Sequence, residues 1–121
     1  MKNQHDPLSE PVIQHMRNDY TTLPLQTTVG EALAMIRETG VGEKIVYFYV
    51  VDEEGILAGV IPTRRLLTAA MESPVSEIMI PRVVAISDRA TLLEACEMFI
   101  LHKFLAFPVT DQQGIIRGVI D

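Results

Sequence analysis

An internal repeat constrains this chain more than any other feature of its sequence. Residues 11–16 (PVIQHM) match residues 74–79 (PVSEIM) at an offset of 63 positions, and the match continues at the same offset from TVGEA to TLLEA. Residues 48–61 then match residues 107–120 at an offset of 59, with an aspartate and two glycines in equivalent places. Each copy is too short to bury a core of its own, so the two copies are expected to pack against each other.

The two copies also share helix signals. Thr28 with Glu31, and Thr91 with Glu94, have the spacing of a capping box, in which the first turn of a helix is satisfied by side chains. Apolar residues then recur with a helical period. The predicted helices are residues 12–17, 29–38, 64–71, 75–79 and 92–102.

Two strands joined by a tight turn end each copy. The turns read DEEG at residues 52–55 and DQQG at residues 111–114, each with a glycine where a positive φ is needed. The offset falls from 63 to 59 because the first copy carries extra residues near 39–46, where Gly40 and Gly42 indicate a loop insertion. The predicted extended segments are 21–23, 46–51, 56–61, 83–86, 106–110 and 115–120.

These elements predict an α/β (α+β) fold built from two β-α-β-β-α repeats. The repeats are expected to form a sandwich with a pseudo-twofold axis, the second repeat lacking its closing helix. We divide the chain into an N-terminal tail (1–10), a first repeat (11–73) and a truncated second repeat (74–121). Because the sequence stops directly after an expected buried strand, we expect it to be cut from a longer protein.

Charge and composition exclude several classes of protein. The formal net charge is −6, from 16 acidic and 10 basic residues, which argues against nucleic-acid binding because that requires a clustered positive surface. Cys96 is the only cysteine, so an internal disulfide and a cysteine-based zinc site are excluded. No apolar run approaches the roughly 20 residues that cross a bilayer, and the first residues do not resemble a signal peptide. We therefore expect a soluble, cytoplasmic segment that does not itself insert into a membrane.

Catalytic chemistry is not expected. The three histidines (His5, His15 and His102) have no metal-ligand spacing, and the sequence contains no P-loop, Gly-x-Ser-x-Gly or Gly-x-Gly-x-x-Gly motif. The densest acidic cluster, residues 52–54, is either a solvated turn or a divalent-cation site completed by oxygen ligands from another strand or subunit. The sequence thus predicts a binding protein that is not an enzyme and requires no cofactor, and it leaves any metal ligands unknown.

With these motifs in view, the chain resembles a tandem pair of CBS (cystathionine-β-synthase) domains from about residue 11 to residue 121. The most specific stretches are 48–52 and 107–111, each followed by two glycines. The resemblance implies a regulatory module whose cleft between repeats often binds AMP, ADP, ATP or S-adenosylmethionine and which adjusts an attached enzyme, channel or transporter. It also implies a homodimer, and we expect Met16, Met35, Met79 and Met98 on its contact faces.

Two stretches suggest the kind of protein to which the module is attached. Residues 60–67 (VIPTRRLL) and 101–109 (LHKFLAFPV) are similar to the cytosolic part of MgtE-like divalent-cation transporters of bacteria. That resemblance implies a sensor of adenine nucleotide, of Mg²⁺, or of both, which controls a downstream membrane transporter. Two alternatives stay open: an adenylate-sensing module of a soluble protein or enzyme, and a structural dimerisation unit with an empty cleft.

The family resemblance also implies where the phosphates of a nucleotide would lie. The family commonly reads ribose with an aspartate in the pattern Gly-h-h-(Ser/Thr)-x-x-Asp, but here residues 59–65 read GVIPTRR, so Arg65 stands at the aspartate position. We expect the phosphates near Thr63, Arg64 and Arg65, where a helix N-terminus and two cationic groups favour an anion. The alternative is that both arginines belong to a solvated helix start or pair with glutamates.

Adenine is expected against an apolar wall. The candidates are Tyr20 and Tyr47 in one copy, or Val83, Val84, Leu105, Ala106 and Phe107 in the other. The alternative is that these residues belong to the core. Because the ribose-binding carboxylate is absent, any binding of AMP, ADP or ATP is expected to be weak.

Overall fold

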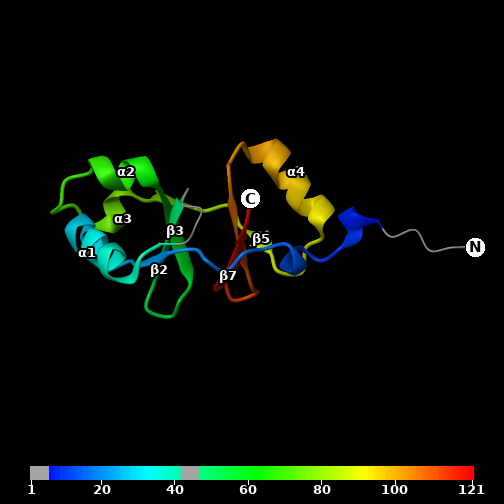
Figure 1. Ribbon diagram of the computed structural model, residues 1–121, viewed down its shortest axis with the longest axis horizontal. Coiled ribbons are helices and arrows are strands. Elements are labelled where there is room, and N and C mark those ends of the chain that lie inside the picture. Colours follow the sequence, from blue (N-terminus) through cyan, green and yellow to red (C-terminus); the bar gives the residue numbers. More distant parts are fainter. Residues whose placement is uncertain (1–5, 42–46) are drawn as a thin grey trace, which may run out of the picture.

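The computed structural model describes residues 6–41 and 47–121, which form two small sheets lying side by side (Figure 1). The first repeat contains β1 (Thr22–Pro24), α1 (Val29–Thr39), β2 (Tyr47–Val51), β3 (Leu57–Pro62) and α2 (Thr63–Thr68). The second contains α3 (Val75–Ile78), β4 (Ile80–Pro81), β5 (Ile86–Ser87), α4 (Leu92–His102), β6 (Phe107–Thr110) and β7 (Ile116–Ile120). Two 3₁₀ turns, η1 (Pro7–Ser9) and η2 (Val12–Gln14), precede them.

The two hairpins have the same register, which confirms the predicted α/β fold of two repeats. Phe48 pairs with Ile61 in the β2–β3 hairpin, and Phe107 pairs with Ile120 in the β6–β7 hairpin. Both ladders shift register at the equivalent point near their turn. In each sheet a short strand, β1 or β5, runs parallel to the first hairpin strand.

Both predicted capping boxes are present. The Thr28 hydroxyl accepts from the Glu31 amide at 3.2 Å, and the Glu31 carboxylate accepts from the Thr28 amide at 2.9 Å. Thr91 and Glu94 repeat this arrangement at 3.3 and 2.9 Å. Caps of this kind contribute about 1 kcal/mol each and fix where α1 and α4 begin.

The acidic turn between β2 and β3 uses its first carboxylate for backbone hydrogen bonds. Asp52 Oδ1 accepts from the amides of Glu54 and Ile56, both at 2.9 Å, and Gly55 has a φ of 85°. The second repeat forms the same turn from Asp111. Among residues 6–41 and 47–121, no group of three or more His, Cys, Asp or Glu side chains is arranged to hold a metal ion.

Some expected boundaries differ from the structure. Residues 83–85, expected to be extended, do not pair in a sheet, because Arg82 (φ 57°) turns the chain after β4. The strand β4 itself was not expected. The helix expected over 64–71 is shorter, and the loop expected around Gly42 lies outside the described residues.

The segments that lead into the two repeats are exchanged between them. Val12 is buried in the core of the second repeat with Ile86 and Phe107, and its amide donates to Ala90 O at 2.8 Å. In the equivalent place, Val75 is buried in the core of the first repeat, and its amide donates to Thr27 O at 2.9 Å. Figure 1 shows the result: the N-terminal segment lies beside α4 before crossing to β1.

A third core lies along the seam where the two sheets meet. It contains Tyr49 and Val60 from the first repeat and Ala106 and Val119 from the second. Because side chains alternate along a strand, Phe48 points into the core of its own repeat while Tyr49 points into the seam. No helix among the described residues is long and apolar enough to cross a membrane.

Two methionines, Met16 and Met79, pack the exchanged segments against glycines of β7 and β3. A Cβ added at Gly118 would lie 2.5 Å from Met16 Sδ and 3.1 Å from Arg17 O, and Met79 packs on Gly59 in the same way. The side chains of Met16 and Met79 therefore pack against strands of the same chain. Their expected place on a dimer face remains a prediction.

Gly118→Ala is expected to lower the free energy of unfolding by about 1–3 kcal/mol, because the added methyl group must displace the Met16 side chain. Urea unfolding measures this change. Combining it with Met16→Ala removes most of the overlap, so the double variant should be less destabilised than the sum of the single variants. Strictly additive effects would contradict the close packing of these two residues.

Tyr49→Phe is expected to raise the free energy of unfolding by about 1 kcal/mol at neutral pH. The Tyr49 side chain is only 2% exposed, and its hydroxyl has no hydrogen-bond partner among the residues described. Burial raises the pKa of the Tyr49 phenol, so the unfolded chain ionises first, at about pH 10, and the parent should lose stability as the pH rises above that value. The Tyr49→Phe variant should lose less stability than the parent as the pH rises above about 10. Tyr20→Phe is the matched control, because the Tyr20 hydroxyl donates to Ile116 O at 3.4 Å and its removal should not stabilise the fold.

Candidate functional site

A pocket of about 780 Å³, which we call the seam pocket, lies between α2 and the segment that precedes β6. Its volume is in the range of small-molecule sites. It draws on both repeats and contains five of the residues predicted for a nucleotide site. The lining residues are Tyr47, Pro62, Thr63, Arg64, Arg65, Thr68 and Leu105.

Tyr47 joins the two repeats at this pocket. It begins β2, and its hydroxyl accepts a hydrogen bond from the Leu105 amide at 3.4 Å. Its ring meets that of Phe104 edge to face, with centroids 6.1 Å apart. Phe104 was not among the residues predicted from the sequence, although the helix-ending His102-Lys103 pair just before it marks the point where the chain turns toward the seam.

The two arginines provide the charge of the pocket. Arg65 donates to Ile78 O at 3.0 Å and so ties α2 to the end of α3. Arg64 is exposed and makes no ion pair with any residue that the structure describes. Because α2 has six residues and no side-chain cap, attraction for an anion must come mainly from the guanidinium groups and not from a helix dipole.

The apolar wall predicted for adenine is closely packed. Val83, Val84 and Ala106 line a void of about 10 Å³ together with Tyr47. A space of that size barely holds a water molecule. A flat ring can therefore lie against Tyr47 and Leu105 in the seam pocket but cannot enter the gap behind them without movement.

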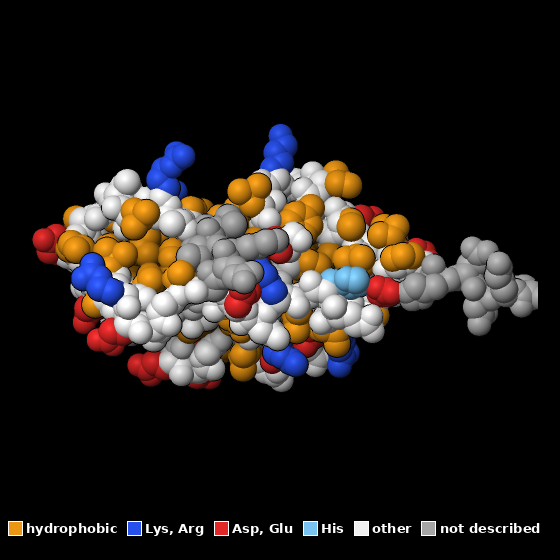
Figure 2. Space-filling view, viewed as in Figure 1, with side chains coloured by type: hydrophobic (Ala, Val, Ile, Leu, Met, Phe, Trp, Pro, Cys, Tyr) orange, Lys and Arg blue, Asp and Glu red, His pale blue; other side chains and the backbone are white. Residues whose placement is uncertain are grey.

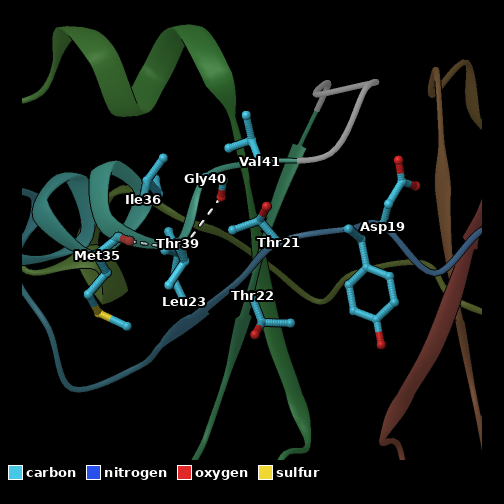
Figure 3. Close-up of a pocket in the computed structure, with 10 residues that line it drawn as sticks. Asp19, Thr21, Thr22, Leu23, Met35, Ile36, Thr39, Gly40 and Val41 are labelled. Carbon is cyan, nitrogen blue, oxygen red and sulfur yellow. Dashed lines mark hydrogen bonds between the residues drawn. The ribbon is translucent and has the colours of Figure 1, made fainter.

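Tyr20, expected to share a half-site with Tyr47, lines a different pocket of about 400 Å³ beside α1. Figure 3 shows this second pocket between Met35 of α1 and Thr22 of β1. The exchange of leading segments explains the separation: Tyr20 precedes β1 and packs against the second repeat, with its hydroxyl donating to Ile116 O. In this second pocket the Thr39 hydroxyl donates to Met35 O at 2.9 Å, closing the end of α1.

Phe107, also expected near the base, lies in the core of the second repeat. Its side chain is fully buried, and its ring meets those of Phe99 and Phe104 at centroid distances of 4.7 and 5.6 Å. It does not line the seam pocket.

Comparisons with known proteins agree with this architecture. The CBS domain model matches residues 12–72 and 75–121. The magnesium transporter MgtE of Thermus thermophilus is 34% identical over 106 residues, which are 87% of this chain and 24% of that protein. An inosine-5'-monophosphate dehydrogenase of Aquifex aeolicus is 36% identical over 107 residues, covering 85% of this chain and 21% of the enzyme.

A solved structure of an MgtE protein shows that the similarity extends to the fold. The cytosolic domain of the Mg²⁺ channel MgtE, crystallised in complex with ATP, superposes with a TM-score of 0.85 at 32% identity, covering 93% of this chain and 46% of that one. The chain spans about a quarter of the length of the curated MgtE relatives that it matches. It belongs to the CBS domain family, as a tandem pair of repeats similar to the cytosolic CBS part of MgtE magnesium transporters.

Proposed function

We propose that this chain is a regulatory module that binds an adenine nucleotide in the seam pocket. One observation carries the proposal: a single pocket places an aromatic ring, Tyr47, beside two guanidinium groups, Arg64 and Arg65. A nucleotide combines a flat apolar base with a polyanion, and those are the two features that such a surface binds. The relative crystallised with ATP supports the choice of ligand.

The position of the pocket supports a regulatory role. Its walls come from both repeats, and the hydrogen bond from the Leu105 amide to the Tyr47 hydroxyl crosses the seam at the pocket. A ligand that touches both repeats favours one relative arrangement of them, so binding can shift the equilibrium between arrangements.

The similarity to MgtE proteins supports an attached transporter as the target of this regulation. In this proposal the module works in the cytoplasm and senses nucleotide, Mg²⁺, or both, to control transport of Mg²⁺. The similarity to an inosine-5'-monophosphate dehydrogenase supports the alternative, a module attached to a soluble enzyme. In neither case does the module itself carry out catalysis.

The module is further proposed to act as a homodimer. Figure 2 shows hydrophobic side chains gathered over α4, where Ile100 and Leu101 are 78% and 71% exposed. A face of this kind usually marks a protein contact. Sedimentation at tens of micromolar should show a dimer, and a monomer alone would contradict the proposal.

Arg64→Ala is expected to weaken ATP binding about ten- to hundredfold, the range for a lost hydrogen bond to a charged group. Isothermal titration of the whole chain with AMP, ADP and ATP, with and without Mg²⁺, measures the affinities. Arg89→Ala is the matched control, because it removes the same charge from an exposed position outside the seam pocket. Equal loss in both variants would contradict the assignment of the phosphates, and a chain that binds no nucleotide would support a structural role with an empty cleft.

A further inference from the structure

The side chains of the seam pocket combine two cationic donors, Arg64 and Arg65, with three neutral hydroxyl groups, those of Tyr47, Thr63 and Thr68. Among the lining residues that the structure describes, none carries a carboxylate. Arg64 and Arg65 offer guanidinium groups, which donate and cannot accept. The Tyr47 oxygen, an acceptor, already accepts from the Leu105 amide.

This set of side chains is unfavourable for recognising the ribose of a nucleotide. The adjacent hydroxyl groups of ribose are bound most strongly when a carboxylate accepts both protons. In the seam pocket Arg65 supplies a guanidinium group instead, which donates to Ile78 O at 3.0 Å. Within the described lining, the ribose hydroxyl groups can therefore meet neutral hydroxyl groups, such as that of Thr68, but no carboxylate.

The same lining side chains favour a negatively charged ligand. The chain as a whole has a net charge of −6, yet the described lining of this pocket contains two cationic side chains and no acidic one. Coulomb attraction grows with each phosphate charge that comes near the guanidinium groups. The number of phosphates then determines the affinity more than the sugar does.

We infer that the seam pocket selects a nucleoside polyphosphate by its base and its phosphate charge, and that it does not distinguish ribose from 2'-deoxyribose. This inference rests on the proposed function, because it specifies which nucleotides that site accepts. It follows from the side chains of this chain alone: Tyr47 for the base, Arg64 and Arg65 for the phosphates, and no described carboxylate for the sugar.

The test compares matched ligands by isothermal titration of the whole chain. ATP and 2'-deoxy-ATP should bind with affinities within about threefold of each other, whereas a carboxylate that reads the sugar would separate them about ten- to hundredfold. AMP should bind at least about tenfold more weakly than ATP, because it brings fewer charges to the arginines. Arg64→Ala should remove most of the difference between ATP and AMP, and Arg89→Ala should leave it unchanged.

Three results would overturn the inference. A tenfold or greater loss of affinity for 2'-deoxy-ATP relative to ATP would show that the pocket recognises the sugar. Equal affinities for AMP and ATP would show that phosphate charge does not determine binding. Both results leave nucleotide binding itself intact. Failure of all three nucleotides to bind at millimolar concentration would instead overturn the proposed function, and the inference with it.

Discussion

The exchange of leading segments is the interaction on which the rest of the structure depends. Val12 and Val75 are completely buried. Val12 leads into the first repeat but packs in the core of the second, and Val75 leads into the second repeat but packs in the core of the first. Burying one such side chain contributes about 1.5–3 kcal/mol, and the backbone hydrogen bonds beside it hold the segment in place. Neither repeat can complete its own core without the other. The two repeats are therefore expected to unfold together, as one cooperative unit.

This exchange also builds the candidate site. The segment after α3 crosses to β3, where Ile80 pairs with Val60, and it carries Val83 and Val84 to the back of the seam pocket beside Tyr47. The equivalent segment of the first repeat carries Tyr20 to the other side of the seam. The pocket beside α2 and the pocket beside α1 are thus lined by different side chains. Of the two, only the one beside α2 combines an aromatic ring with a pair of arginines among the described residues.

The sequence predicted the parts of the fold that local signals determine. The capping threonines set the start of α1 and α4, and the aspartate–glycine turns set the register of both hairpins, because each signal acts within a few residues. It also named Tyr47, Arg64, Arg65 and Leu105 as candidates, but with Tyr47 and Leu105 as alternatives in different half-sites, whereas all four line the seam pocket. Their role in binding remains a prediction. It could not place Tyr20 or Phe107, since the side of the seam that a segment covers is determined by packing between the repeats. Phe107 has the character of a wall residue, but strand alternation turns it into the core.

A pocket whose walls belong to two repeats links the affinity for a ligand to the arrangement of those repeats, and this link is the central claim for the module. A crystal structure of the chain with ATP tests it most directly. We expect the base against Tyr47 and Leu105 and the phosphates at Arg64 and Arg65, so that one molecule of ATP contacts both repeats. A nucleotide found beside Tyr20 and α1, or one that touches a single repeat, would contradict the account.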